Sequence, residues 1–351
     1  MENYKSILDI HGFPKRNYKF SRIKTLFSNR VFFFSKFKRR FDVCLDLQNF
    51  NFINFFYQDY HLERYYLDKI SKIKFFNINF KLLSKLCFYF LKKEKIFLKD
   101  NDIILFGPYS HSYSHVIHEF FTRLIFIQNK KKTHCIYLPL NLKKILESKV
   151  YKKIFFKFKF KYYSTNKNYI FYNCNYLTQT HNRWAYKKNK KIVPLEFKRL
   201  INNFAQKAHN FTSKKNYDNF KYLIISRENA AKRRLINEDI LYENLKKYGF
   251  KKIFFEKLSF EKQIELSKNC KIMLGYHGAG LTNVFFMKPG SQCIEIVNKH
   301  YTHEHIKYFA KSVNVKHKKF LSKKSYKNLD GICDVAEIEN YLLSNFFNSS
   351  L

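Results

Sequence analysis

The sequence contains little glycine and proline and few acidic residues. Only 8 of its 351 residues are Gly and 5 are Pro, whereas 46% are apolar, and this composition excludes a collagen-like or a Pro/Gly-rich disordered chain. It has no run of 18 apolar residues that would span a bilayer, and residues 1–20 contain no apolar core of a signal peptide. We therefore expect a soluble, cytoplasmic protein, and the length favours two domains.

The spacing of the seven cysteines indicates little about the structure. They are scattered, odd in number, and form no C-x-x-C pair, so the spacing favours neither a disulfide framework nor a zinc site. A reducing compartment agrees with this pattern.

Positive charge is in large excess. The chain has 67 Lys and Arg against 27 Asp and Glu, a formal net charge of +40. Lysine supplies 55 of these cations, and it is abundant together with Phe, Asn, Ile and Tyr, so a bias toward A/T-rich codons explains much of the excess. The other explanation is an anionic partner, which would be a nucleotide, a nucleic acid or an acidic lipid surface.

The C-terminal part shows alternating strand and helix signals. Five of the eight glycines fall between Gly249 and Gly290. Asn237 and Ser259 are expected to cap helices, and Gly249 is expected to end the first of them. Repeated units of this length predict a parallel sheet covered on both faces, with ligands at the carboxyl ends of its strands. The predicted strands are 222–226, 252–256, 271–274 and 292–297, with a loop and helix at 278–287 and a helix at 303–313.

The N-terminal part is less regular. We predict strands at 102–106, 133–138 and 169–172 and a helix at 113–127, whereas residues 1–100 do not distinguish helix from strand. The Lys/Asn-rich segment 205–219 is the expected linker. The predicted domains are therefore residues 1–205 and 206–351.

The first candidate site is the glycine-rich turn G-Y-H-G-A-G-L-T-N at 275–283. Glycines there let the main chain approach a ligand, and the N–H groups of the following helix attract an anion such as a diphosphate. The spacing matches neither the dinucleotide fingerprint nor a P-loop, so a purely structural turn is the alternative. The candidate residues are His277, Gly278, Ala279, Gly280, Leu281, Thr282 and Asn283.

A cluster of arginines forms the second candidate. Three of the twelve arginines follow the first predicted strand, and arginine binds phosphate oxygens through paired hydrogen bonds. Salt bridges to nearby Glu228, Glu238 or Asp239 are the alternative. The candidate residues are Ser226, Arg227, Arg233 and Arg234.

Two further groups carry titratable side chains. His115 and Glu119 are four residues apart on a predicted helix, so they share a face and can form a general base; a structural pair is the alternative. His111 and His115 lack the further ligands that a metal site needs. Glu295 stands in an apolar strand, where it would hold a ribose or pair with a lysine.

These motifs together resemble a known family. The segments ISRENAAKRRLINEDIL and GYHGAGLTNVFFMKPGSQCIEI look like glycosyltransferase family 61, and the similarity extends over about residues 223–309. The upstream segment SYSHVIHEFFTRL is similar to the family's N-Y-x-H-x-x-x-E-x-x-x-R-L helix, with Ser112 where Asn is usual. The matching residues are Tyr113, His115, Glu119, Arg123 and Leu124.

The resemblance implies an α/β fold of the GT-B kind, with two Rossmann-like domains facing a central cleft. It implies inverting transfer of a hexosyl or pentosyl group from a nucleotide-sugar, with no metal ion or other cofactor. In this reading Arg227 with Arg233 or Arg234 grips the diphosphate, the turn at 278–280 stabilises the leaving group, and Glu295 holds the ribose.

The same resemblance suggests that residues 1–205 form the acceptor side and that residues 206–351 bind the nucleotide-sugar. His115 or Glu119 would activate the acceptor hydroxyl, and the acceptor would be a capsular or lipid-linked surface glycan. A basic face toward an anionic membrane would suit such an acceptor. The alternatives are a basic nucleic-acid-binding protein, in which neither the glycines nor Arg227 are needed, and a family member that binds a nucleotide-sugar without turnover.

Overall fold

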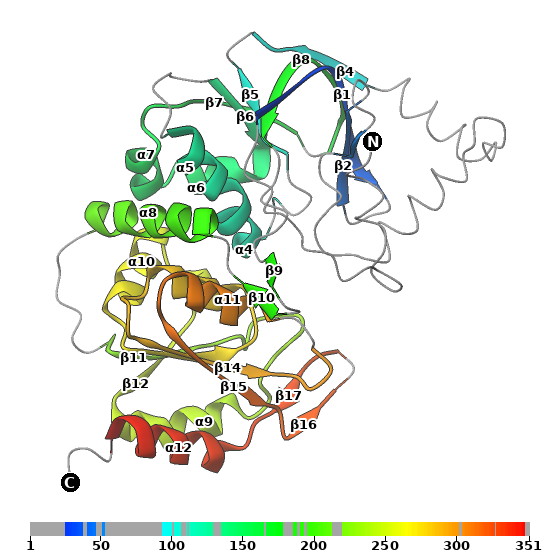
Figure 1. Cartoon of the computed structure of the whole chain (residues 1–351). Coiled ribbons are helices and arrows are strands. Elements are labelled where there is room, and N and C mark those ends of the chain that lie inside the picture. The colour runs from blue at the N-terminus through cyan, green and yellow to red at the C-terminus, as the bar shows by residue number, and fades with distance from the viewer. Residues whose placement is uncertain are drawn as a thin grey trace. The chain divides into compact units, whose positions relative to one another are not determined.

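The chain folds into two compact units, residues 1–146 with 155–194 and residues 147–154 with 195–351, which we call the first and the second unit (Figure 1). The computed structural model describes residues 25–37, 41–46, 51–52, 93–99, 102–106, 110, 112–128, 135–164, 166–177, 185–187, 190–192, 195–212, 220–301, 304–326 and 328–347.

A mixed sheet forms the centre of the first unit. Its strand order is β3-β2-β1-β8-β5-β6-β7, and β4 also pairs with β8. The pairs β8-β5, β5-β6 and β6-β7 are parallel. The pairs β8-β1, β1-β2 and β2-β3 are antiparallel, which departs from the expected Rossmann-like pattern. The strands are β1 (Thr25–Phe37), β2 (Phe41–Asp46), β3 (Asn51–Phe52), β4 (Lys93–Phe97), β5 (Ile103–Ile104), β6 (Cys135–Pro139), β7 (Lys159–Tyr163) and β8 (Asn168–Leu177).

The helix predicted at 113–127 is present but is not a uniform α-helix. It consists of α4 (Tyr113–His115), a π-helical turn η1 (Val116–Phe121) and α5 (Thr122–Gln128). Such π-turns occur often at functional sites because they rotate side chains out of the regular helical pattern. The unit also contains η2 (Leu140–Leu142), α6 (Lys143–Leu146) and the hairpin of β9 (Ala185–Lys187) and β10 (Lys190–Ile192).

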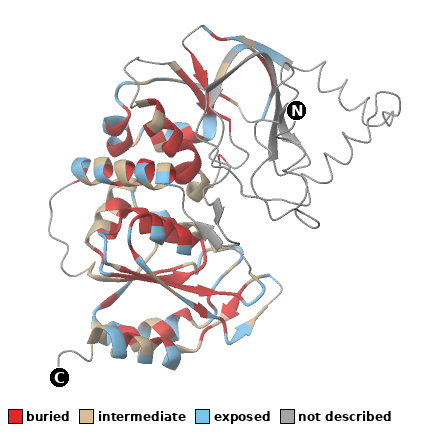
Figure 2. Ribbon diagram, in the orientation of Figure 1, coloured by how far each residue is buried: buried red, intermediate tan, exposed pale blue. Residues whose placement is uncertain are grey.

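The second unit is a parallel sheet between two layers of helices, as the sequence predicted. The strand order is β12-β11-β13-β14-β15, and every pair is parallel. Helices α9 and α12 cover one face, and α8, α10 and α11 cover the other (Figure 1). The strands of this sheet are largely buried, whereas the outer faces of the helices are exposed (Figure 2).

The elements of the second unit have the following bounds. The strands are β11 (Tyr222–Ile225), β12 (Phe250–Ile253), β13 (Ile272–Tyr276), β14 (Gln292–Val297), β15 (Lys316–Leu321), β16 (Lys324–Ser325) and β17 (Gly331–Ile332). The helices are α7 (Lys149–Ile154), α8 (Leu195–Phe211), α9 (Glu238–Leu245), η4 (Lys246–Tyr248), η5 (Phe255–Lys257), α10 (Phe260–Asn269), η6 (Ala279–Phe286), α11 (His305–Ser312), α12 (Val335–Leu342) and η7 (Leu343–Phe347).

Local signals succeed at some helix ends and fail at others. The hydroxyl of Ser259 accepts from the N–H of Lys262 and caps α10, and Gly249 takes the left-handed conformation after η4, as predicted. The cap predicted at Asn237 is wrong, because its side chain instead binds both the N–H and the carbonyl of Cys333.

Two predicted boundaries also need correction. The strand predicted at 252–256 runs over 250–253, and the chain then turns into η5. The linker predicted at 205–219 is wrong in its first part, because α8 continues to Phe211 and buries Ala205 and Ala208. The predicted domain boundary at 205/206 therefore falls within α8.

The cap on α10 gives a test of the second unit's stability. Replacing Ser259→Ala leaves the N–H of Lys262 without this acceptor, so we expect the free energy of unfolding to fall by about 1 kcal/mol. Urea denaturation followed by circular dichroism measures the change. Ser344→Ala, at an exposed hydroxyl that donates to the carbonyl of Asn340, is the control, and an equal loss in both variants would contradict the capping role.

Candidate functional site

The candidate residues of the second unit lie where its strand order reverses. From β11 the chain moves to β12 on one side and then crosses to β13 on the other, so β11 and β13 are neighbours whose following loops diverge. Open parallel sheets bind ligands at such a switch point, outside the carboxyl ends of the strands. Ile225 pairs with Gly275 in the register, so Ser226 and Arg227 leave the sheet beside the turn that carries His277 and Gly278.

Arg227 lies directly on the glycine turn. A Cβ atom added at Gly278 would lie 1.9 Å from Nη1 and 2.5 Å from Cζ of Arg227. Gly278 is fully extended, so its backbone would accept another residue; the constraint is the close approach of the guanidinium. A side chain at residue 278 would therefore have to displace the guanidinium of Arg227.

Main-chain carbonyls hold the guanidinium of Arg227 in this place. Its Nε donates to the carbonyl of Arg233 at 2.8 Å and its Nη2 to that of Lys232 at 3.1 Å. The carboxylates considered as salt-bridge partners, Glu228, Glu238 and Asp239, all pair with Lys252, and Glu238 also accepts from the main-chain N–H of Arg227. Burial and the charge of Arg233 lower the pKa of Arg227 to about 10, so it still carries its charge at neutral pH.

The other two arginines have different surroundings. Arg233 has a left-handed backbone (φ 59°), which aims its carbonyl at Arg227, and its guanidinium lies 6.0 Å from the ring centre of Tyr301. A non-glycine residue in this region stores strain, as residues at functional sites often do. Arg234 instead donates twice to the carboxylate of Asp330, at 3.1 and 3.2 Å, so a structural ion pair occupies it.

The turn after β13 also presents main-chain donors. The N–H of His277 binds the carbonyl of Ile296, but within the described residues no acceptor contacts the N–H groups of Gly278, Ala279 and Gly280. These three groups stand at the start of η6, where free N–H groups attract negative charge. The turn thus brings main-chain donors close to the guanidinium of Arg227.

Side chains deeper in the same motif face the interior. Leu281, Thr282 and Asn283 are at most 1% exposed, and the amide of Asn283 donates to Gln263 and to the carbonyl of Gly280. The hydroxyl of Ser226 donates to the buried carboxylate of Glu238. The side chains of Asn283 and Ser226 bond within the protein interior and stabilise the turn and the end of β11. The contact of these four residues with a nucleotide-sugar stays a prediction.

His277, Glu295 and His317 form a buried chain of hydrogen bonds. Nδ1 of His277 and Nε2 of His317, the latter at 2.9 Å, bind one oxygen each of the Glu295 carboxylate, which is 1% exposed. Burial raises the pKa of Glu295, but the bonds to both histidines outweigh this and hold it below its usual value. Within the described residues its hydrogen-bond partners are these two histidines and not the lysine considered as an alternative, and its role in holding a ribose stays a prediction.

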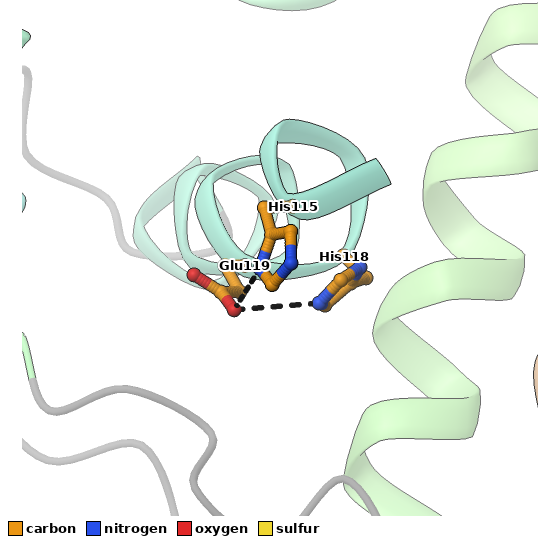
Figure 3. Close-up of side chains that lie close together, drawn as sticks. All are labelled: His115, His118 and Glu119. Atoms are coloured by element: carbon orange, nitrogen blue, oxygen red, sulfur yellow. Dashed lines mark hydrogen bonds and ion pairs between the residues drawn. The ribbon is translucent and has the colours of Figure 1, made fainter. Parts of the chain in front are cut away.

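The first unit contains a second buried carboxylate with two histidines. Oε1 of Glu119 accepts from Nδ1 of His115 at 2.7 Å and lies 3.4 Å from Nε2 of His118, and both rings point toward it (Figure 3). Burial raises the pKa of Glu119, but the charges and hydrogen bonds of the two histidines outweigh it and keep the pKa well below 4.5. The carboxylate is therefore ionised at neutral pH, and it orients the ring of His115.

A buried arginine fixes the helix that carries this cluster. Arg123 is 0% exposed, and its guanidinium donates to the carbonyls of Glu119 and Phe106, at 2.9 and 2.8 Å. Burial lowers the pKa of Arg123 to about 10. Its bonds tie the π-helical turn to the segment that follows β5.

The three side chains of this cluster are also those that a metal ion would use. Two tetrahedral zinc ligands, each about 2.0–2.1 Å from the ion, lie about 3.3 Å apart. The separation of His118 and Glu119 fits this, but the 2.7 Å between His115 and Glu119 is a hydrogen-bond length. A metal ion would thus have to displace the proton between His115 and Glu119 and widen the pair.

Comparison with known proteins decides the family. The sequence profile described as Glycosyltransferase 61 matches residues 113–294, just over half of the chain. The chain belongs to glycosyltransferase family 61. A search of curated proteins finds no match.

The matched region of this family 61 chain begins with the first residue of α4 and ends inside β14. It therefore contains the Glu119 cluster, Arg227 and the glycine turn, and it supports glycosyltransferase activity. Within the described ranges every helix is too short or too polar to span a bilayer.

The sequence did not single out three residues that the structure adds. One is His118, because the sequence gives no sign of the π-helical turn in which its ring contacts Glu119. Tyr301 packs 4.1 Å from the ring of His277, and His317 reaches Glu295 from the neighbouring strand. The signal for His317 was Glu295, a charged residue in a predicted buried strand, which must find a partner. No such signal pointed to Tyr301.

The ionised state of Glu119 predicts how stability depends on pH. Because the folded state lowers this pKa, the unfolded state binds more protons below about pH 4.5, and stability falls as the pH drops through that range. Glu119→Gln should make the dependence shallower by up to about 1.4 kcal/mol per pH unit. Urea titrations at several acidic pH values measure it, and parallel curves for both proteins would contradict the assignment.

Proposed function

We propose that this chain is an inverting glycosyltransferase that moves a hexosyl or pentosyl group from a nucleotide-sugar to a hydroxyl of a surface glycan. The observation that carries the proposal is the contact of Arg227 with Gly278 at the switch point. A guanidinium, three main-chain N–H groups and a helix start in one place suit a diphosphate. Membership of family 61 supports the same reaction class.

In this proposal the second unit stabilises the leaving group. The bond between the anomeric carbon and the diphosphate oxygen breaks, and negative charge grows on that diphosphate. Arg227 and the N–H groups of residues 278–280 are already in place for this charge, so their stabilisation increases as the bond breaks. Arg233 adds positive charge beside them, whereas Arg234 is excluded because Asp330 holds it.

The first unit supplies the base in this proposal. The acceptor oxygen attacks the anomeric carbon from the face opposite the leaving group, which inverts the configuration, and its proton passes to His115. We assign the base to His115 rather than Glu119 because their side chains are 12% and 3% exposed. Glu119 then orients the ring and stabilises the imidazolium.

The remaining parts of the proposal follow the family resemblance. They are a GT-B arrangement of two domains, transfer without a metal ion, a capsular or lipid-linked acceptor, and a cytoplasmic location with peripheral contact to an anionic membrane. In a metal-free reaction His115 and Glu119 would act through the hydrogen bond that joins them. The +40 net charge supports attraction to anionic lipids.

The donor site is tested by nucleotide binding. Among UDP, GDP, ADP and CDP, at least one should raise the melting temperature of the protein. Arg227→Ala should weaken its binding by a factor of about 10–100, since it removes a charge-assisted contact to phosphate. Calorimetry gives the affinity, and Arg199→Ala, at an exposed position on α8, is the matched control. Equal affinity in all three proteins would exclude a diphosphate site at Arg227.

The base is tested by turnover. His115→Asn should lower kcat by about 10²–10⁴ and leave nucleotide affinity unchanged, because the base acts only on the acceptor. Glu119→Gln should act in the same direction. The measurement is product formation by mass spectrometry, with His300→Asn at an exposed position as control. A normal kcat in His115→Asn would remove His115 from the mechanism.

A further inference from the structure

The buried chain of His277, Glu295 and His317 constrains where protons can lie. An ionised carboxylate only accepts hydrogen bonds, so both ring nitrogens that contact Glu295 must carry a proton. These are Nδ1 of His277 and Nε2 of His317. Glu295 is 1% exposed and held from two sides, so it has no alternative orientation that would free these protons.

His277 stands at the edge of the candidate donor site. It directly precedes Gly278, and its ring packs 4.1 Å from that of Tyr301, which in turn lies beneath the guanidinium of Arg233. Within the described residues its only side-chain hydrogen bond is the one through Nδ1. Burial lowers the pKa of His277 despite the carboxylate, with a smaller contribution from Arg233 and Arg227, so the ring is neutral at pH 7.

A neutral histidine with its proton on Nδ1 has a lone pair on Nε2. This atom accepts hydrogen bonds, and a fully ionised phosphate offers it no donor. His277 is 4% exposed and directly precedes Gly278, so a ligand would have to bind close against Gly278 to reach this acceptor. The hydroxyl groups of a nucleotide-sugar are the donors that suit it.

We propose that Glu295 and His317 are positioning residues that hold His277 in the Nδ1-protonated tautomer, so that its Nε2 accepts a hydrogen bond from a hydroxyl of the donor. The inference rests on the proposed donor site in the second unit. It makes His277 a specificity-determining residue and gives Glu295 an indirect role. His317 lies on β15, next to β14, and its hydrogen bond fixes the orientation of the Glu295 carboxylate.

The tautomer can be measured without any ligand. Nitrogen-15 chemical shifts of the histidine rings in the full chain, assigned through His277→Asn, should show His277 protonated at Nδ1 at pH 7. Glu295→Gln should weaken this preference, because an amide has one accepting oxygen for two histidines. Glu304→Gln, the same chemical change on another glutamate of the second unit, should leave the His277 signals unchanged.

Ligand binding then separates the two sources of the hydroxyl. The probes are the nucleoside diphosphate that binds the wild type most tightly among UDP, GDP, ADP and CDP, and its sugar conjugates. Glu295→Gln should weaken binding by a factor of about 3–10, the value of one hydrogen bond. A loss with both kinds of probe assigns the hydroxyl to the ribose, and a loss with the conjugates alone assigns it to the transferred sugar.

The outcomes distinguish this inference from the proposed function. A wild-type ring protonated at Nε2 would overturn the inference, and that measurement does not depend on how any variant folds. So would unchanged affinity for every probe in a folded Glu295→Gln protein. If the tautomer is as expected but no nucleotide binds the wild type, the donor site fails and the tautomer assignment stands.

Discussion

The close packing of a guanidinium against a main-chain α-carbon organises the second unit's candidate site. Arg227 occupies the volume that any side chain at residue 278 would need. This contact is possible because β11 and β13 are adjacent and parallel, so that their ends release both residues at one edge of the sheet. The left-handed backbone of Arg233 completes the arrangement by turning a carbonyl toward the same guanidinium.

Both units contain a buried glutamate whose carboxylate contacts two histidines. Each buries a glutamate that would be costly to ionise away from water, and each offsets that cost with two histidines. In the first unit the cluster lies on a π-helical turn tied down by Arg123, and in the second it spans two strands. Each carboxylate therefore fixes the orientation of the histidine rings that bind it.

Much of the second unit could be predicted from sequence, because short apolar runs and glycine turns reflect local physics. Four of the five parallel strands, the cap at Ser259 and the meeting of Arg227 with the glycine turn follow from such signals, whereas the edge strand β15 was not predicted. The partners of Glu295 and Asn237 could not be predicted, since His317 and Cys333 are distant in sequence and reach them only through tertiary packing. In residues 1–100, Phe, Tyr and Lys alternate so densely that the apolar residues show neither the helical nor the strand period. Strands β1–β4 are seen there only in the structure.

The central claim is that the surface formed by Arg227 and the glycine turn binds the diphosphate of a sugar donor. The most direct measurement is a mass-spectrometric screen of nucleotide-sugars incubated with the protein and with a Gly278→Val variant, whose side chain would displace the guanidinium. The account predicts that the wild type releases a nucleoside diphosphate from at least one donor and that the folded variant does not. Release at the same rate by both proteins would contradict it.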